Sequence, residues 1–321
     1  MKKGIIFIGY NILIIVVLFL LSEIIIRIFM PEVQVQGTSG SIIADSVYNS
    51  SHGLRPLSSG KTNGVPVSID QYGFRKSSVE IDTTKDSWLY LGDSVTFGIG
   101  VANDSIFSAL VQAQIDTVNI LNPSAIGYNI NSYWDVFENL IIRNRHNLRI
   151  KKACIFWCLN DTYINVPDFD TPGGSLRYVL SDILRFVRSR SKLYYFLKTL
   201  IFDRPKSYFI FDKSFYQVDN SDLLYSIQIL DKMNTYCREH DIEFNLFLLP
   251  YEYQLRVEDF TPQKLMRELI QNKSFVFSPF ESIDTRKHKS NEFFLYGDGI
   301  HLSKLGHRYL SKFLVNNLME N

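Results

Sequence analysis

The chain has 321 residues, of which 46% are hydrophobic and 14% aromatic, so it is long and apolar enough to bury the core of one large domain. Its 34 basic and 33 acidic residues leave a formal net charge of +1. This balance argues against the basic surface that nucleic-acid binding requires, and we expect no nucleic-acid partner.

One long apolar segment lies at the N-terminus. Residues 4–22 carry no charge and follow Lys2 and Lys3. As a helix they span roughly 28 Å, close to the hydrocarbon thickness of a bilayer. Residues 22–27 lack the small-residue cleavage site of a signal peptide. We therefore predict an uncleaved signal anchor over residues 1–30, with residues 4–22 in the lipid bilayer.

The charges beside this segment predict its orientation. By the positive-inside rule Lys2 and Lys3 stay in the cytoplasm, which places the rest of this single-pass chain across the membrane. Glu23 and Arg27 can pair on one helix face before Pro31 ends the helix. The alternative is a buried core helix, but an all-round apolar terminal helix has no amphipathic face to dock.

Residues 31–85 are rich in small and polar side chains without a sustained period, and we interpret them as a linker and irregular lead-in with short β structure. From residue 86, β-prone runs alternate with helical patterns. Strands are predicted at 88–91, 118–121, 153–158 and 244–249, with a weaker one at 275–277; helices are predicted at 106–115, 132–144, 222–240, 261–271 and 303–318. This alternation is typical of an α/β fold with a mostly parallel sheet covered on both faces.

Residues 162–220 interrupt the alternation. They are longer than an ordinary connection, hold many aromatic side chains and show helical patterns near 175–187 and 193–202. We interpret them as an insertion over one end of the sheet. A functional lid and an additional packing layer are both open alternatives.

The chain has three cysteines. Cys154 and Cys158 are four residues apart on one predicted strand, where about 13 Å separates such positions. That distance is too long for a disulfide. Burial as free thiols is the simpler interpretation, and a disulfide from Cys237 to one of these two is the alternative.

A polar turn follows the first predicted strand. Gly92-Asp93-Ser94 places a serine where a buried strand ends and a helix begins, at the sheet edge where ligands of α/β proteins bind. Backbone N–H groups at a helix start can stabilise an anion, so Ser94 is a candidate nucleophile. Taken alone, however, the tripeptide also suits an ordinary turn or helix cap.

Partners for a nucleophile lie at the ends of later predicted elements. Gly127 follows the second strand, where it can present a backbone N–H, and Asn160 follows the third, where its amide can donate. Asp298 precedes His301 by three residues, a spacing that lets the carboxylate hold one imidazole nitrogen while the other faces Ser94. All of these residues are predicted at one edge of the sheet.

At these positions the chain resembles the SGNH hydrolases, also called GDSL-type esterases and lipases. The resemblance covers residues 86–321 and rests on four ordered blocks, Gly92-Asp93-Ser94, Asn122–Gly127, Asn160-Asp161 and Asp298–His301. It implies a three-layer α/β/α domain with a flavodoxin-like sheet. With the apolar N-terminus and the Gly73-Phe74-Arg75 lead-in, the chain is similar to membrane-anchored bacterial members.

The resemblance also implies residue roles. Ser94 would be the nucleophile, His301 the base and Asp298 its orienting partner, while the N–H groups of Ser94 and Gly127 and the Asn160 side chain would form the oxyanion hole. One departure concerns the third block, where the family has glycine and this chain has Cys158. We expect Asp93 and Asp161 to fix loops.

The sequence therefore predicts an extracytoplasmic serine esterase anchored in the bacterial cytoplasmic (inner) membrane, with its catalytic domain on the periplasmic or extracellular side. Its substrate would be an O-acyl ester, O-acetyl included, on a small molecule or an acylated glycan. One alternative is an O-acyltransferase that modifies a cell-envelope polysaccharide through the same triad, and another is a non-catalytic binding or assembly protein on the same fold. We expect no cofactor and no catalytic metal.

Overall fold

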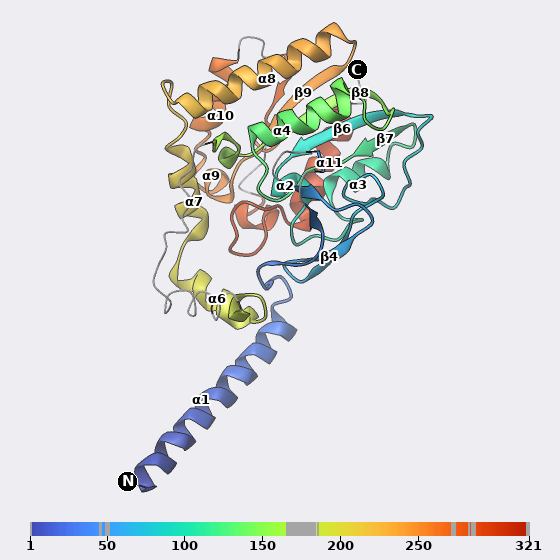
Figure 1. Ribbon diagram of the computed structural model, residues 1–321. Helices are drawn as coiled ribbons and strands as arrows, with labels where there is room; N and C mark the ends of the chain where they lie inside the picture. Colours follow the sequence, from blue (N-terminus) through green and yellow to red (C-terminus); the bar gives the residue numbers. More distant parts are fainter. Residues whose placement is uncertain are drawn as a thin grey trace.

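The structure is a computed structural model that describes residues 2–44, 47–48, 52–164, 184, 186–270, 274–281, 283 and 287–318. A single helix, α1 (Lys2–Phe29), projects from a layered α/β domain (Figure 1). Its segment Phe7–Phe29 has a mean hydropathy of 2.9, and only 6% of its most apolar window is buried. This helix is long and apolar enough to cross a membrane.

The end of α1 matches the sequence prediction. The helix ends at Phe29, before Pro31, and Arg27 pairs with Glu23 at 2.7 Å. The Glu23 carboxylate also accepts hydrogen bonds from the backbone N–H groups of Lys192 and Leu193. The junction between α1 and the domain is therefore fixed by polar contacts to a segment more than 160 residues away.

Five parallel strands form the central sheet, in the order β10-β9-β8-β6-β7. Counted along the chain this is the order 2-1-3-4-5, which is that of flavodoxin-like folds. The predicted strands are confirmed. Their bounds are β6 (Asp86–Gly92), β7 (Val118–Leu121), β8 (Arg149–Trp157), β9 (Glu243–Leu248) and β10 (Val276–Phe277).

Helices cover both faces of this sheet, as the nearly continuous burial of β6 and β8 requires. The chain runs from β6 to β7 in one direction across the sheet, and from β7 through β8 and β9 to β10 in the other. Because βαβ crossovers are right-handed, this change of direction puts α4 and α8 on one face, and α3 on the other with α11 (Figure 1). The five predicted helices are present as α3 (Phe107–Gln112), α4 (Ile130–Phe137, continued by a π-helical turn to Ile142), α8 (Ser221–Glu239), α10 (Thr261–Leu269) and α11 (Lys304–Leu318).

The described part of the insertion follows one side of the domain from the end of α1 (Figure 1). The pattern at 193–202 is confirmed as α6 (Lys192–Ile201), whereas most of the predicted helix at 175–187 lies outside the described residues. Two helices were not predicted, α7 (Arg204–Lys213) and α9 (Glu252–Val257). Both are short, and α7 has little amphipathic pattern because its aromatic and charged side chains alternate around the helix.

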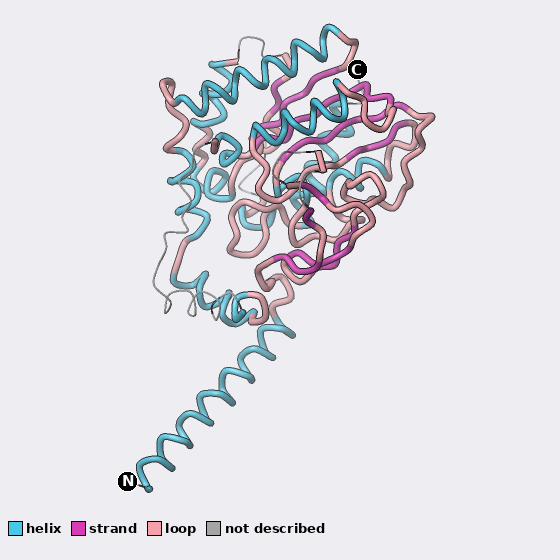
Figure 2. The backbone as a smooth tube through the Cα atoms, in the orientation of Figure 1, coloured by secondary structure: helices cyan, strands magenta, loops and turns pink. Residues whose placement is uncertain are grey.

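The lead-in forms two small antiparallel sheets, set apart from the central sheet in Figure 2. One contains β1 (Thr38–Gly40), β4 (Ser59–Thr62) and β5 (Val65–Ser68), and the other β2 (Ile43–Ala44) and β3 (Gly53–Leu54). The short β structure expected here is confirmed. Buried Ile42, Val67 and Phe74 join the same hydrophobic core as the central strands, so the lead-in packs on the α/β layers.

All three cysteines are buried and free, as expected. Cys154 and Cys158 lie on and just after β8, and Cys237 lies on α8. Burial raises the pKa of Cys237 to about 12, so its thiol stays protonated at neutral pH. These cysteines fill the core rather than cross-link it.

Gly92 occupies a position with no room for a side chain. A Cβ there would lie 3.0 Å from the Phe156 carbonyl oxygen and closer still to the Thr96 side chain. We expect Gly92→Ala to lower the free energy of unfolding by about 2 kcal/mol, the cost of overpacking. Urea unfolding of the full chain in detergent checks this. A free energy of unfolding that Gly92→Ala leaves unchanged would contradict the explanation.

Candidate active site

Ser94 lies at the carboxyl end of the central strand β6. The strand ends at Gly92, and Asp93 caps the short helix α2 (Ser94–Phe97) by accepting a hydrogen bond from the Val95 N–H at 2.8 Å. The cap turns the chain sharply, so that Ser94 is the first helical residue. Its side chain is largely buried, at 9% exposure, and Oγ lies at the sheet edge.

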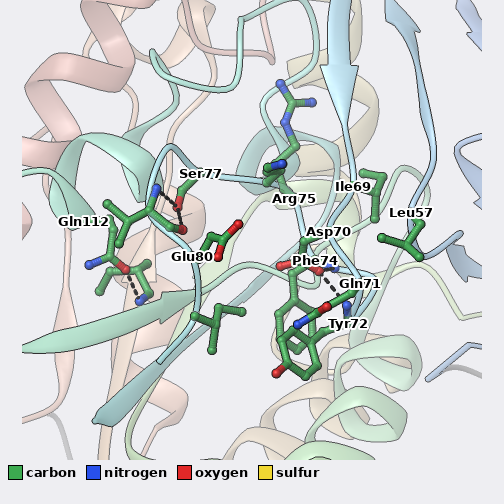
Figure 3. A pocket seen from close by; sticks show the side chains of 14 residues that line it. Leu57, Ile69, Asp70, Gln71, Tyr72, Phe74, Arg75, Ser77, Glu80 and Gln112 are labelled. Atoms are coloured by element: carbon green, nitrogen blue, oxygen red, sulfur yellow. Dashed lines mark hydrogen bonds between the residues drawn. The ribbon is translucent and has the colours of Figure 1, made fainter. Parts of the chain in front are cut away.

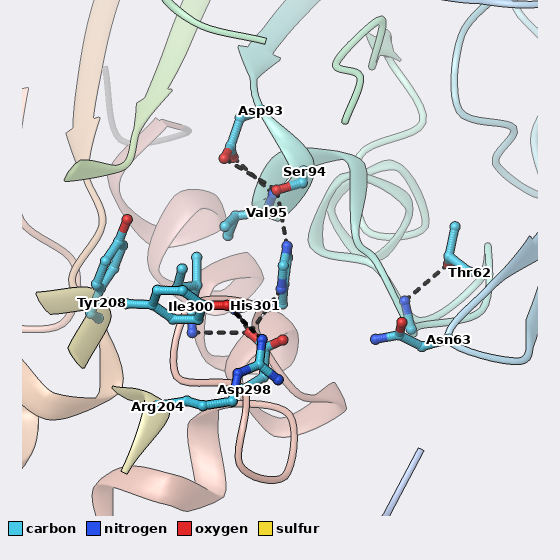
Figure 4. A network of polar contacts seen from close by, with 12 residues as sticks. Thr62, Asn63, Asp93, Ser94, Val95, Arg204, Tyr208, Asp298, Ile300 and His301 are labelled. Carbon is cyan, nitrogen blue, oxygen red and sulfur yellow. Dashed lines mark hydrogen bonds and ion pairs between the residues drawn. The ribbon is translucent and has the colours of Figure 1, made fainter. Parts of the chain in front are cut away.

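The C-terminal loop brings a histidine and an aspartate to this serine (Figure 4). His301 Nε2 lies 2.9 Å from Ser94 Oγ, and His301 Nδ1 lies 2.8 Å from Asp298 Oδ1. The same carboxylate oxygen accepts the backbone N–H groups of Ile300 and His301. With Nδ1–H donated to Asp298, Nε2 is the acceptor that faces the serine hydroxyl.

The charges of this pair are coupled. Burial by itself would raise the pKa of Asp298, but the charge of His301, the hydrogen bonds from its side chain and backbone, and the charge of Arg204 outweigh it, and the pKa lies well below its usual range. Burial would likewise lower the pKa of His301, yet the Asp298 carboxylate more than compensates and raises it. The carboxylate thus stays ionised and stabilises an imidazolium at its side.

The two other predicted residues lie after neighbouring strands. Gly127 follows β7 in an exposed turn with φ +82°, a left-handed conformation that glycine adopts at little cost. Asn160 lies in the 3-10 turn Leu159–Thr162 that follows β8. Because β7 and β8 flank β6, both residues are at the same edge of the sheet as Ser94.

Asn160 also contacts the residue before the serine. Its Nδ2 lies 3.2 Å from Asp93 Oδ2, the oxygen that also lies 3.2 Å from Ser94 Oγ. One amide hydrogen is directed to Asp93, and an amide has a second. Asp161 Oδ2 accepts the Cys158 N–H at 2.6 Å, so this aspartate fixes the turn that carries Asn160, as expected of a loop-fixing residue.

The insertion supplies residues behind Asp298 that the sequence did not indicate. The Arg204 guanidinium donates to the hydroxyls of Tyr195 and Tyr208 at 3.1 and 2.6 Å, and it lies beside the Asp298 carboxylate (Figure 4). Gly299 packs against Pro205, since a Cβ there would lie 2.6 Å from Pro205 Cα. Helices α6 and α7 therefore support the loop that holds Asp298 and His301.

Two cavities lie elsewhere on the domain. One of about 200 Å³ is lined by the lead-in, including Asp70, Phe74 and Arg75, and reaches Gln112 and Ile120 (Figure 3). The other is an open groove of about 1130 Å³ along the α6–α7 junction and the outer side of the 297–299 loop. Neither is lined by Ser94 or His301. In the described part of the chain, no three His, Cys, Asp or Glu side chains are grouped closely enough to hold a metal ion.

Comparisons with known proteins give structural relatives only. No protein-family model matches the chain, and no curated protein matches it. Among solved structures it is similar to a lipolytic G-D-S-L family member from Veillonella parvula DSM 2008, at 12% identity over 74% of this chain and 100% of that one, with a TM-score of 0.44. It is also similar to a lipase/acylhydrolase from Enterococcus faecalis, at 13% identity over 74% and 96% of the two chains, with a TM-score of 0.40.

Proposed function

We propose that this chain is a membrane-anchored serine esterase that cleaves O-acyl esters through an acyl-enzyme. The observation that carries the proposal is the continuous line of contacts from Ser94 Oγ to His301 Nε2, at 2.9 Å, and from His301 Nδ1 to Asp298, at 2.8 Å. Nucleophile and base are within hydrogen-bond distance, and a third group orients the base.

The first half of the reaction forms the acyl-enzyme. His301 Nε2 takes the proton of Ser94 as Oγ attacks the ester carbonyl carbon, and the buried Asp298 carboxylate stabilises the imidazolium. The carbonyl π electrons move to oxygen. The imidazolium then returns its proton to the leaving alkoxide as the C–O bond breaks, so an alcohol departs and the acyl group remains on Ser94.

The second half transfers the acyl group to water. His301 removes a proton from the water as its oxygen attacks the acyl carbon, and the proton goes back to Ser94 Oγ when the tetrahedral intermediate collapses to a carboxylic acid. In both halves the oxyanion is held by the N–H groups of Ser94 and Gly127 and by Asn160 Nδ2. Such donors contribute most when they are fixed before the charge develops.

The substrate is an acyl ester on a small molecule or a glycan, O-acetyl groups included. The position of the triad in a domain that follows an apolar helix supports action beside the membrane. With Lys2 and Lys3 in the cytoplasm, residues 86–321 form the catalytic domain on the opposite side of the bacterial inner membrane.

A membrane-impermeant fluorophosphonate probe tests activity and location together. Such probes phosphonylate a serine only when it is activated, and this probe does not reach the cytoplasm. Applied to spheroplasts that contain the full chain, it should label the protein without lysis. Labelling that needs lysis would contradict the location but not the activity, whereas no labelling before or after lysis would contradict the activity. A known cytoplasmic serine hydrolase in the same cells is the control for membrane integrity.

A further inference from the structure

Three polar side chains connect the insertion to the Asn160 amide, which we place in the oxyanion hole. They are those of Tyr163, Asp212 and Tyr251. The Tyr251 hydroxyl, just before α9, lies 2.9 Å from Asn160 Oδ1 and 2.5 Å from Asp212 Oδ2. The other oxygen of Asp212 accepts a hydrogen bond from the Tyr163 hydroxyl. Asp212 is only 4% exposed and Tyr251 is fully buried, so both depend on protein partners.

The number of protons restricts how these contacts are made. A tyrosine hydroxyl has one hydrogen, whereas an amide oxygen and an ionised carboxylate only accept, so Tyr251 cannot donate to both neighbours. Turning the Asn160 amide does not help, because its Oδ1 would then face the Asp93 carboxylate that Nδ2 now contacts at 3.2 Å. A proton on Asp212 Oδ2 satisfies every contact, since Asp212 then donates to Tyr251 and Tyr251 to Asn160.

The surroundings of Asp212 favour the protonated form. Burial raises the pKa of Asp212 to about 7, although the hydrogen bond from Tyr251 acts in the opposite direction. Lys213, the next residue on α7, pairs with Asp259 at 2.6 Å. The titratable groups that face Asp212 are all acids, which cannot carry the positive charge that would stabilise its carboxylate. They are Cys158, Asp161 and Tyr163 after β8, Tyr251 before α9, and Tyr216 after α7.

We propose that Asp212 is a positioning residue for the oxyanion hole: as a neutral acid it donates to Tyr251, and Tyr251 in turn holds Asn160 with one amide N–H directed at the reacting carbonyl. This inference rests on the proposed esterase function and adds to it a pH-sensitive support that the insertion supplies. It also assigns the insertion a role in the reaction, beyond covering one side of the domain.

Loss of the Asp212 proton would reverse the chain of donors. The ionised carboxylate would take the Tyr251 hydrogen, and Asn160 Oδ1 would face a hydroxyl oxygen with no hydrogen to share. Asn160 would then lose its fixed orientation, and stabilisation of the oxyanion would weaken. Deprotonation of Asp212, at about pH 7, should therefore reduce the gain in activity that deprotonation of His301 brings.

The test is the dependence of kcat on pH, between about pH 6 and about pH 9, for hydrolysis of an activated acetate ester by the full chain. At the alkaline end of this range, where both His301 and Asp212 have lost their protons, the wild-type kcat should be roughly 10-fold lower than that of Asp212→Asn. In Asp212→Asn the amide donates to Tyr251 and accepts from Tyr163 at every pH, so kcat should rise to a plateau as His301 loses its proton. Tyr251→Phe should lower kcat roughly 10-fold with little change in KM.

Asp231→Asn is the matched control, because burial also raises the pKa of this carboxylate, but it lies on α8 and outside the chain to Asn160. It should keep the wild-type profile. Equal kcat values of the wild type and Asp212→Asn at about pH 9 would overturn the proposal, as would a Tyr251→Phe enzyme with the wild-type kcat.

An infrared titration separates this inference from the function on which it rests. A neutral Asp212 should give the C=O band of a protonated carboxyl group at about pH 6 that disappears by about pH 9 and is absent from Asp212→Asn. If the protein proves inactive, this band still decides the protonation of Asp212, and its absence from the wild type would refute the proton count. If the band is present while the profiles of wild type and Asp212→Asn coincide, Asp212 is neutral but does not position Asn160.

Discussion

Replacing Ser94 by alanine is expected to lower kcat/KM for an activated ester by about 10⁴-fold and to abolish labelling by a fluorophosphonate. The substitution removes one buried oxygen, the atom 2.9 Å from His301 Nε2, and leaves the strand end and its cap in place. Without Oγ no acyl-enzyme forms. Only the oxyanion donors and the general base acting on water remain.

The control for this variant is Ser226→Ala. Ser226 is equally a buried serine, but its hydroxyl donates to a backbone carbonyl within α8. It should keep both activity and labelling. If Ser94→Ala were labelled as strongly as the wild type, while its unfolding transition was unchanged, another residue would be the nucleophile.

Asp298→Asn is expected to lower kcat/KM by a factor similar to that of Ser94→Ala, roughly 10⁴-fold. Asp298 Oδ1 accepts the His301 Nδ1–H and thereby leaves Nε2 as the acceptor for the serine proton. An asparagine that presents its N–H₂ to Nδ1 would favour the opposite tautomer, in which Nε2 carries the hydrogen and cannot act as the base. The charge that stabilises the imidazolium is lost as well.

Asp86→Asn provides a matched control on a carboxylate. Asp86 pairs with Arg149 on the surface at the amino ends of β6 and β8, far along the strand from Ser94. Such an exposed pair contributes about 1 kcal/mol or less to stability, so the control should retain activity. Equal activity of Asp298→Asn and the wild type would show that Asp298 does not orient His301.

The central sheet could be predicted from sequence because buried parallel strands are continuous apolar runs. The predicted strand at 118–121 matches β7 residue for residue, and the helix predicted at 222–240 matches α8 to within one residue at each end. The same regularity explains the site. Since parallel strands share one carboxyl edge, the residues that follow them meet there, and Ser94 contacts His301 across 207 positions of sequence.

The contributions of the insertion could not be predicted in this way. Asp212 and Tyr251 are 39 residues apart, and Tyr251 and Asn160 are 91 apart. No spacing rule links a tyrosine before one helix to an aspartate at the end of another. The aromatic content of residues 162–220 predicted an apolar packing layer or lid, but it did not indicate which polar groups the layer carries inward.

Peptide mass spectrometry of the phosphonylated full chain identifies the nucleophile. We expect one adduct, on the peptide that contains Ser94, formed by the wild type and absent after Ser94→Ala or His301→Ala, with both variants folded. An adduct on any other residue of the wild type, or an adduct that survives Ser94→Ala, would contradict the assignment of Ser94 as the nucleophile activated by His301.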